Sequence, residues 1–257
     1  MEMSTYIPSE QLRPFVRGYR IIESQEGVVN RVLPDTSFAL AFRFRGQISY
    51  LKGTEKAALP LATISGLRTL ARLISYSPKT AAIIVALRET AAGAFLKQPL
   101  QGLFGESVPL HEFFPVSEIS IIEERLAGTE SNRIRVAVVE DFLRSKLNYS
   151  KADSLVENAI AKIYSTKGMV RITELADSLC ISQDAFEKRF RKRTGATPKQ
   201  FSNIVRMKAI ILYNPSPSSF LDMALGNGFY DQAHFNKGFK NFTGQTPTDF
   251  LKSASYW

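Results

Sequence analysis

Hydrophobic and polar residues alternate along the early part of the chain, where Phe38, Leu40, Phe42 and Phe44 all fall on one side of the alternation. Successive side chains of a β-strand point to opposite faces, so a period of two predicts a strand with a phenylalanine-rich buried face. Four further strand-like segments are bounded by turn signals, and these are Val16–Ile22, Leu61–Ile64, Arg72–Tyr76 and Thr80–Leu87. We therefore predict an antiparallel sandwich or small barrel.

Beyond Glu89 the apolar residues follow the longer period of helices. Short helices are predicted over ETAAGAFLK and SEISIIEERLAG, and a longer one over Ser131–Leu147. Within the longer helix, Ile134, Val138 and Phe142 form one stripe, which is expected either to pack on the domain's own sheet or to form a dimer seam.

The polar segment Leu147–Asp153 has no apolar period, and it predicts a boundary between a domain of residues 1–150 and a domain of residues 151–257. The second domain has helical patterns throughout. The helices predicted there are Ser154–Ser165, Thr173–Leu179, Gln183–Thr194, Pro198 to about Tyr213, Phe220–Asn227, Gln232–Thr243 and Pro247–Ala254.

One segment of the second domain occurs twice, as FRKRTGATPKQF at residues 190–201 and FKNFTGQTPTDF at residues 239–250. Of the twenty aligned pairs from Ser182/Asp231 to Phe201/Phe250, nine are identical. Such a match indicates a structural unit used twice.

The ends of the repeated helices carry capping signals. Ser182 and Asp231 are expected N-caps, because their side-chain oxygens can accept from an unpaired amide of the first turn. Gly195 and Gly244 are expected to end the same helices, since glycine adopts the left-handed conformation without strain.

In each copy a short helix, a tight turn and a second helix form the pattern of a helix-turn-helix unit, whose second helix can enter a DNA major groove. The pairs Phe186/Phe190 and Phe235/Phe239, four residues apart, turn one face of each second helix to the core. The opposite faces are predicted to contact DNA, with Gln183, Asp184, Glu187, Lys188 and Arg191 in the first copy and Gln232, Ala233, His234, Asn236, Lys237 and Lys240 in the second. A linker helix of about 24 Å, with its flanking turns, could set the two reading helices ~34 Å apart, one turn of DNA.

The net charge of +9 is concentrated in the second domain. Residues 1–150 hold 18 Lys and Arg against 15 acids, whereas residues 151–257 hold 15 against 9. Between Lys188 and Lys208 there are eight basic residues and no acid. This stripe is either a solubilising surface or the footprint of a polyanion, and its position beside a predicted groove helix favours DNA.

The sequence LADSLCISQDAFEKRFRKRTGATPKQFSNIVRMKAIIL, with MALGNGFYDQAHFNKGFKNFTGQTPTDFLK, resembles the DNA-binding domain of AraC/XylS-type bacterial transcription regulators. The resemblance covers roughly residues 155–254, and its motif A-x-x-x-G-F-x-D-x-x-x-F-x-x-x-F-K-x-x-x-G-x-(S/T)-P matches Ala224 to Pro247. It implies two helix-turn-helix units joined by a linker helix. It also implies an N-terminal jelly-roll-like domain with terminal helices that binds an effector or dimerises, giving an α+β protein of two domains.

The first reading helix departs from the family, whose members usually carry neutral or basic groups there. Asp184 and Glu187 lie beside Lys188, and acids are repelled by phosphates. We hypothesise that the first unit contributes less affinity and that the second does more of the base reading.

Other residues raise alternatives to DNA binding. Cys180 occupies a turn position, which favours a packing or turn role over a redox or alkyl-acceptor role. Arg43 and Arg45 are expected on a wet strand face, or else in an effector site. His111 is the only histidine of the first domain, too few for a metal cluster. We therefore expect no enzyme activity, metal or cofactor.

The predicted function is sequence-specific transcription regulation, with double-stranded DNA, RNA polymerase, a small-molecule effector and a second copy of the chain as expected partners. An architectural DNA binder without an effector, or an enzyme domain fused to a DNA-binding tail, is the alternative. A single cysteine and the lack of an apolar run of ~18 residues predict a cytoplasmic protein without a membrane segment.

Overall fold

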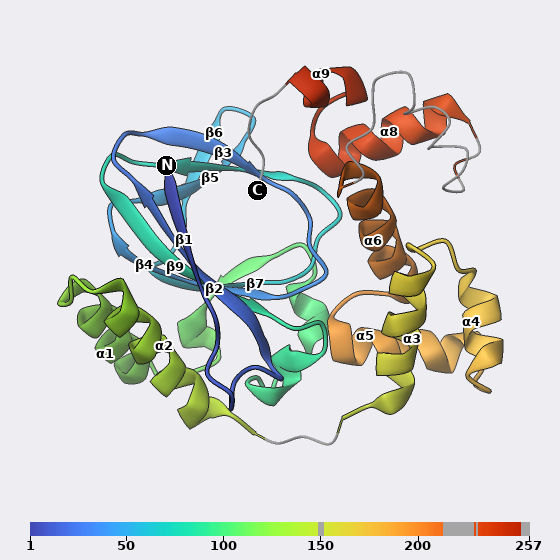
Figure 1. Ribbon diagram of the computed structural model, residues 1–257, viewed down its shortest axis with the longest axis horizontal. Helices are drawn as coiled ribbons and strands as arrows, with labels where there is room; N and C mark the ends of the chain where they lie inside the picture. The colour runs from blue at the N-terminus through green and yellow to red at the C-terminus, as the bar shows by residue number, and fades with distance from the viewer. Residues whose placement is uncertain (149–151, 213–228, 230, 253–257) are drawn as a thin grey trace. The chain divides into compact units, whose positions relative to one another are not determined.

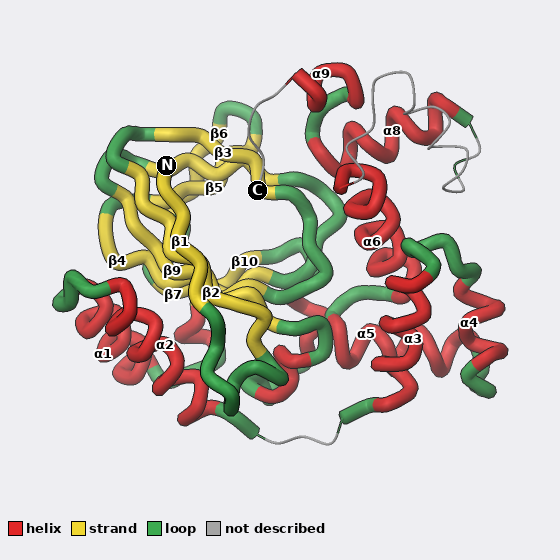
Figure 2. The backbone as a smooth tube through the Cα atoms, in the orientation of Figure 1, coloured by secondary structure: helices red, strands yellow, loops and turns green. Residues whose placement is uncertain are grey.

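The computed structural model describes residues 1–148, 152–212, 229 and 231–252 (Figure 1). The chain divides into two compact units, one of residues 1–30, 37–66 and 73–151 and the other of residues 31–36, 67–72 and 152–257. The first is rich in strands and the second is helical, as the hydrophobic patterns predicted (Figure 2). The predicted helix Phe220–Asn227 lies outside the described residues.

Ten strands form two sheets in the β-rich part. The six-stranded sheet has the order β1-β2-β9-β4-β7-β10, and its strands are Glu2–Tyr6 (β1), Val16–Ser24 (β2), Thr80–Leu87 (β9), Ala39–Arg45 (β4), Ala62–Ser65 (β7) and Ser107–Pro109 (β10). The four-stranded sheet has the order β3-β8-β5-β6, with Val28–Val32 (β3), Arg72–Tyr76 (β8), Ile48–Lys52 (β5) and Glu55–Ala58 (β6). The predicted strands are confirmed to within a few residues at their ends.

Helices follow the strands along the chain. The helices α1 (Val116–Ala127) and α2 (Asn132–Lys146) confirm the predictions over SEISIIEERLAG and Ser131–Leu147, and Figure 1 shows them packed together. Three short 3-10 helices precede them, η1 (Ala91–Ala94), η2 (Leu100–Leu103) and η3 (Leu110–Glu112). The helix predicted over residues 89–97 is therefore only the single turn η1, because Gly93 and the nearby Pro99 disfavour an α-helix.

The phenylalanine-rich face of β4 packs against α2. Phe38, Leu40, Phe42 and Phe44 are all buried, as the alternation predicted. The Phe42 and Phe142 rings meet edge to face with centroids 6.1 Å apart. The apolar stripe of α2 therefore packs on its own sheet through Val138 and Phe142.

Two predictions in this unit need correction. Ile134, which the stripe included, is 53% exposed and lies off the packed face. The face of β4 opposite the phenylalanines is not fully wet, because Arg43 is half-buried there and donates to the Gly46 carbonyl, whereas Arg45 is exposed and pairs with Glu23 at 2.8 Å. Burial lowers the pKa of Arg43, and the charge of Glu123 on α1 opposes that shift.

The α1–α2 corner is held by a buried arginine. Arg135 donates from Nε to the Leu126 carbonyl at 3.1 Å and from its terminal nitrogens to the carbonyls of Thr129 and Glu130. Its guanidinium lies 4.1 Å above the Phe44 ring. Burial lowers the pKa of Arg135, but the carbonyls that would otherwise lack partners stabilise its charged form.

The helical unit contains α3 (Ser154–Ser165), α4 (Ile172–Ser178), α5 (Gln183–Thr194), α6 (Pro198–Leu212), α8 (Gln232–Thr243) and α9 (Pro247–Lys252). Each agrees with a predicted helix to within two residues at either end. α5 packs against α3, α4 and α6, and α8 packs against α9. The two repeated segments therefore form similar helical corners, one between α5 and α6 and the other between α8 and α9.

Candidate nucleic-acid interface

The turn between α4 and α5 is a left-handed helix ending. Cys180 has φ +53°, and the Ile181 amide donates back to the Ala176 carbonyl at 3.2 Å. This hydrogen bond is that of a Schellman motif, in which the residue after the C-cap is usually glycine. Cys180 is exposed, so its role is in the turn and not in packing.

Both reading helices begin at the predicted N-caps. The Ser182 hydroxyl accepts from the Ala185 amide at 3.4 Å, and the Asp231 carboxylate accepts from the His234 amide at 2.7 Å. Both helices end at the predicted glycines, with Gly195 at φ +73° and Gly244 at φ +74°. The two copies therefore position their reading helices with the same backbone geometry.

A threonine hydroxyl closes each reading helix from inside. Thr194 is fully buried, donates to the Phe190 carbonyl at 3.0 Å and accepts from the Ala196 amide at 3.3 Å. Thr243 repeats this arrangement with the Phe239 carbonyl at 2.8 Å and the Gln245 amide at 3.2 Å. The hydroxyl satisfies backbone groups that the end of a helix leaves without partners.

The second threonine of the repeated segment starts the next helix. Thr197 accepts from the Gln200 amide at 3.2 Å, while the Gln200 side chain accepts from the Thr197 amide at 2.9 Å. In the second copy, Thr246 accepts from the Asp249 amide at 3.2 Å. These are capping boxes or close variants of them, so Thr-Gly-x-Thr-Pro ends one helix and begins the next within five residues.

Phenylalanine rings fix the inner faces of the reading helices. Phe186 and Phe190 are fully buried with ring centroids 5.7 Å apart, and Phe190 also meets Phe201 of α6 at 5.5 Å. In the second copy Phe239 meets Phe250 of α9 at 5.3 Å. Each reading helix is thereby held with its opposite face in solvent.

The structure places every predicted DNA-contacting residue on those outer faces. All are exposed apart from Glu187, which is half-buried, and they are Gln183, Asp184, Glu187, Lys188 and Arg191 on α5 and Gln232, Ala233, His234, Asn236, Lys237 and Lys240 on α8. Their contact with DNA stays a prediction. Within the unit, the His234 ring also touches Phe229, with centroids 5.3 Å apart.

The outer face of α5 is engaged in its own polar pairs. Lys188 forms an ion pair with Asp184 at 2.8 Å, and the Gln183 amide donates to Glu187 at 2.9 Å. The hydrogen bond and charge of Asp184 raise the pKa of Lys188. Both pairs are solvent-exposed and can open at low cost when a phosphate competes.

Asp153 holds two more cations of α5. It caps α3 by accepting from the Val156 amide at 3.3 Å, and it pairs with Arg189 at 2.8 Å and Arg193 at 3.6 Å. Burial would raise the pKa of Asp153, but the Arg189 and Val156 hydrogen bonds and the two arginine charges hold it below its ordinary value. These arginines therefore fasten α5 to α3.

The sequence favoured DNA contact for the whole basic stripe from Lys188 to Lys208, and it missed the pairing of Arg189 and Arg193 with Asp153. A signal was present, because an aspartate directly before a helix is an N-cap, and a buried cap attracts cations. Its partner, however, lies 36 residues away along the chain. Only packing of α3 on α5 selects Arg189.

The outer face of α8 carries no acid from Gln232 to Thr243. Lys237 and Lys240 are exposed, and within the described part of the chain neither forms an ion pair. The two reading helices thus have the same backbone geometry, but only the outer face of α5 carries acids.

Two families match the chain. Residues 175–253 match the family described as "Helix-turn-helix domain", and residues 4–109 match a "Domain of unknown function (DUF6597)". The C-terminal part of the chain is therefore a helix-turn-helix domain, in agreement with the two helical corners described for it.

Curated relatives agree with this assignment. The chain is 30% identical to the Msm operon regulatory protein of Streptococcus mutans over 58% of its own length and 55% of the relative's. It is 29% identical to an uncharacterized HTH-type transcriptional regulator of Haemophilus influenzae over 48% of its own length and 42% of the relative's. The chain spans about half the length of these relatives.

The solved structure of ToxT from Vibrio cholerae is 11% identical and covers 98% of both chains, with a TM-score of 0.46. No helix in the described ranges is long and apolar enough to cross a membrane.

Proposed function

We propose that the protein is a sequence-specific transcription regulator of the AraC/XylS type, in which α5 and α8 read double-stranded DNA. The observation that carries the proposal is the shared geometry of the two copies. Each has an N-cap, a left-handed glycine and a threonine-closed end, and each exposes one polar face. A polar helix face presented twice in one domain suits two successive major-groove contacts.

The β-rich unit would regulate DNA binding, by binding a small-molecule effector or by forming a homodimer. RNA polymerase would be the partner whose activity at the promoter changes when the protein binds DNA. The chain would act as a regulator and not as an enzyme, which is supported by relatives that are named as regulators. Binding to the cytoplasmic chromosome follows from this role.

The proposal is tested by fluorescence polarisation of the full chain with a duplex from its own upstream region, against a scrambled duplex, at several salt concentrations. Preference for the native duplex is expected, with a log–log salt slope that steepens by ~0.9 for each phosphate contacted. Equal affinity for both duplexes would instead indicate an architectural DNA binder, and binding to neither would contradict the proposal.

A further inference from the structure

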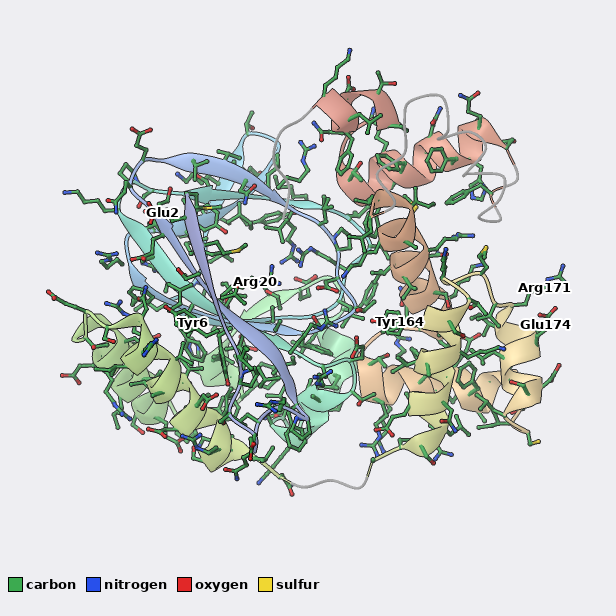
Figure 3. The ribbon with its side chains drawn as sticks, viewed as in Figure 1. Glu2, Tyr6, Arg20, Tyr164, Arg171 and Glu174 are labelled. Atoms are coloured by element: carbon green, nitrogen blue, oxygen red, sulfur yellow. The ribbon has the colours of Figure 1, made fainter. Side chains whose placement is uncertain are left out.

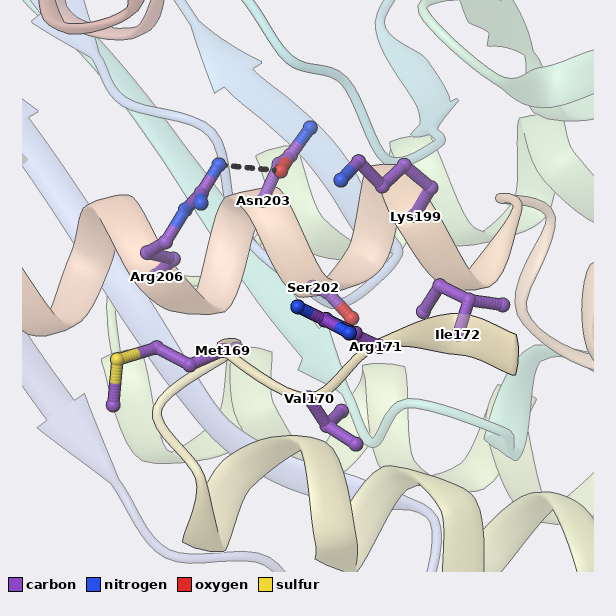
Figure 4. A pocket seen from close by; sticks show the side chains of 9 residues that line it. Met169, Val170, Arg171, Ile172, Lys199, Ser202, Asn203 and Arg206 are labelled. Atoms are coloured by element: carbon purple, nitrogen blue, oxygen red, sulfur yellow. Dashed lines mark hydrogen bonds between the residues drawn. The ribbon is translucent and has the colours of Figure 1, made fainter. Parts of the chain in front are cut away.

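The helical unit contains a pocket that its helix-turn-helix role does not use. The pocket has a volume of about 320 Å³ and lies between the α3–α4 loop and α6 (Figure 4). The loop contributes residues 168–171, α4 contributes Ile172, and α6 contributes Lys199, Ser202, Asn203 and Arg206. A volume of this size is at the lower end of the range for small-ligand sites.

Two polar atoms of the lining are buried without a partner. Ser202 is 2% exposed, and neither its Oγ nor the Nε of Arg206 has a hydrogen-bond partner among the residues that the structure describes. Buried hydroxyl and guanidinium groups are nearly always paired, since an unpaired one costs free energy. A hydroxyl and an N–H at the same pocket indicate an acceptor that belongs there.

The charge of the lining identifies the acceptor as an anion. Arg171, Lys199 and Arg206 supply three cations, and the described residues that line the pocket include no aspartate or glutamate. Arg171 also lies 3.5 Å from Glu174, an exposed contact on the outer side of α4 (Figure 3) that an incoming anion can displace.

Arg206 is held ready by its neighbours. One terminal nitrogen donates to Asn203 at 2.9 Å, and the guanidinium lies 4.5 Å from the Phe229 ring centroid. Burial lowers the pKa of Arg206, so an anion beside it would stabilise the charged form.

The wall of the pocket is closely fitted. Gly168 has φ +75°, and a Cβ at that position would collide with the Ser202 carbonyl oxygen and the Arg206 amide nitrogen. The loop backbone therefore lies directly on α6 beside the two unpartnered atoms.

We propose that this pocket binds a phosphate group. Arginine and lysine with a hydroxyl are the donors that a phosphate's oxygens require, and planar guanidinium suits them best. The phosphate would belong either to a small phosphorylated metabolite or to the DNA backbone, and the second source rests on the proposed function. In the first case the helical unit has an effector site of its own.

The test follows the line width of inorganic phosphate by phosphorus NMR as full-length chain is added at constant chloride. Broadening is expected with the wild type and with Lys162→Gln, which removes an exposed cation of α3 that does not line the pocket. Lys199→Gln and Ser202→Ala should bind phosphate about tenfold more weakly, because each removes one donor. Lys199 is exposed, so its replacement leaves folding intact. No broadening with the wild type, or equal broadening with all four chains, would overturn the proposal.

The source of the phosphate is separated by duplex titrations of the same four chains. If the DNA backbone occupies the pocket, duplex displaces phosphate, and Lys199→Gln loses ~0.9 from the log–log salt slope relative to Lys162→Gln. Ser202→Ala, which removes a neutral donor, then weakens duplex binding without a change in slope. If a metabolite occupies it, phosphate still binds beside duplex and the slopes agree. If the chain bound phosphate but did not bind duplex DNA, the pocket proposal would be supported and the proposed function would be contradicted.

Discussion

At the scale of single residues, the repeated segment is explained by what its threonines and glycines do for the backbone. Thr194 and Thr243 each bond a helix carbonyl and a following amide from a buried position. Gly195 and Gly244 adopt positive φ, which turns the chain from the end of each reading helix toward the next helix. These functions need particular side chains at fixed spacing, which explains why the two copies have the same residues at these positions.

Replacing Thr194 or Thr243 with valine should lower the free energy of unfolding by about 1–3 kcal/mol, because the shape is kept while buried backbone groups lose their partner. Urea unfolding measures the loss. Thr173→Val, at an exposed position of α4, is the matched control and should change stability little. If the buried and exposed variants were equally stable, the threonines would have no capping role.

Cys180 carries a side chain at a left-handed backbone position, which glycine adopts without strain. Cys180→Gly should therefore raise the free energy of unfolding by about 1 kcal/mol. Cys180→Ala keeps the Cβ and should give no gain in the same urea experiment. A gain from alanine equal to that from glycine would show that the thiol, and not the backbone, causes the cost.

At the scale of elements, α5 and α8 have the same backbone geometry at their ends and differ in the charge of their outer faces. On α5 the acids pair with Lys188 and Gln183, and Asp153 holds Arg189 and Arg193. α8 has no acid to compete for its lysines. The second helix therefore offers its cations to a phosphate without first breaking a pair.

Lys237→Ala should weaken duplex binding more than Lys188→Ala does, since Lys188 is already paired in the free protein. Fluorescence polarisation at fixed salt compares the two. Asp184→Asn is the complementary variant, and it should tighten binding because it releases Lys188 and removes a charge repelled by phosphate. Intact binding by Lys237→Ala with binding lost in Lys188→Ala would reverse the assignment.

At the scale of the whole molecule, stability depends on pH through the buried carboxylate that joins α3 to α5. The pKa of Asp153 in the folded chain lies below its ordinary value. A depressed pKa stabilises the fold above the unfolded pKa of about 4, and this contribution is lost as pH falls through the folded value.

Asp153→Asn should lower the free energy of unfolding by about 2 kcal/mol at pH 7, since it removes a charge-assisted pair whose acid is 8% exposed. The difference from wild type should shrink as the pH falls below about 4. Urea unfolding at both pH values measures it, with Asp249→Asn, an exposed acid of α9, as control. An equal loss at both pH values would mean that the charge of Asp153 is not involved.

The sequence by itself determined the features that depend on near neighbours along the chain. The period of two gave β4 and its buried phenylalanines, and capping letters within four residues gave the ends of α5 and α8. Hydrophobic period, N-caps and left-handed glycines act over one turn, so they can be predicted without knowing the fold. The two reading faces follow from the same local spacing.

Only the tertiary structure decided which distant groups meet. It placed Arg189 on Asp153, stacked Arg135 on Phe44, and removed Ile134 from the packed stripe of α2. It also brought the loop after α3 onto α6 around Ser202 and Arg206. These contacts depend on how helices and sheets pack, and many residues of suitable charge or size would have satisfied the local pattern equally well.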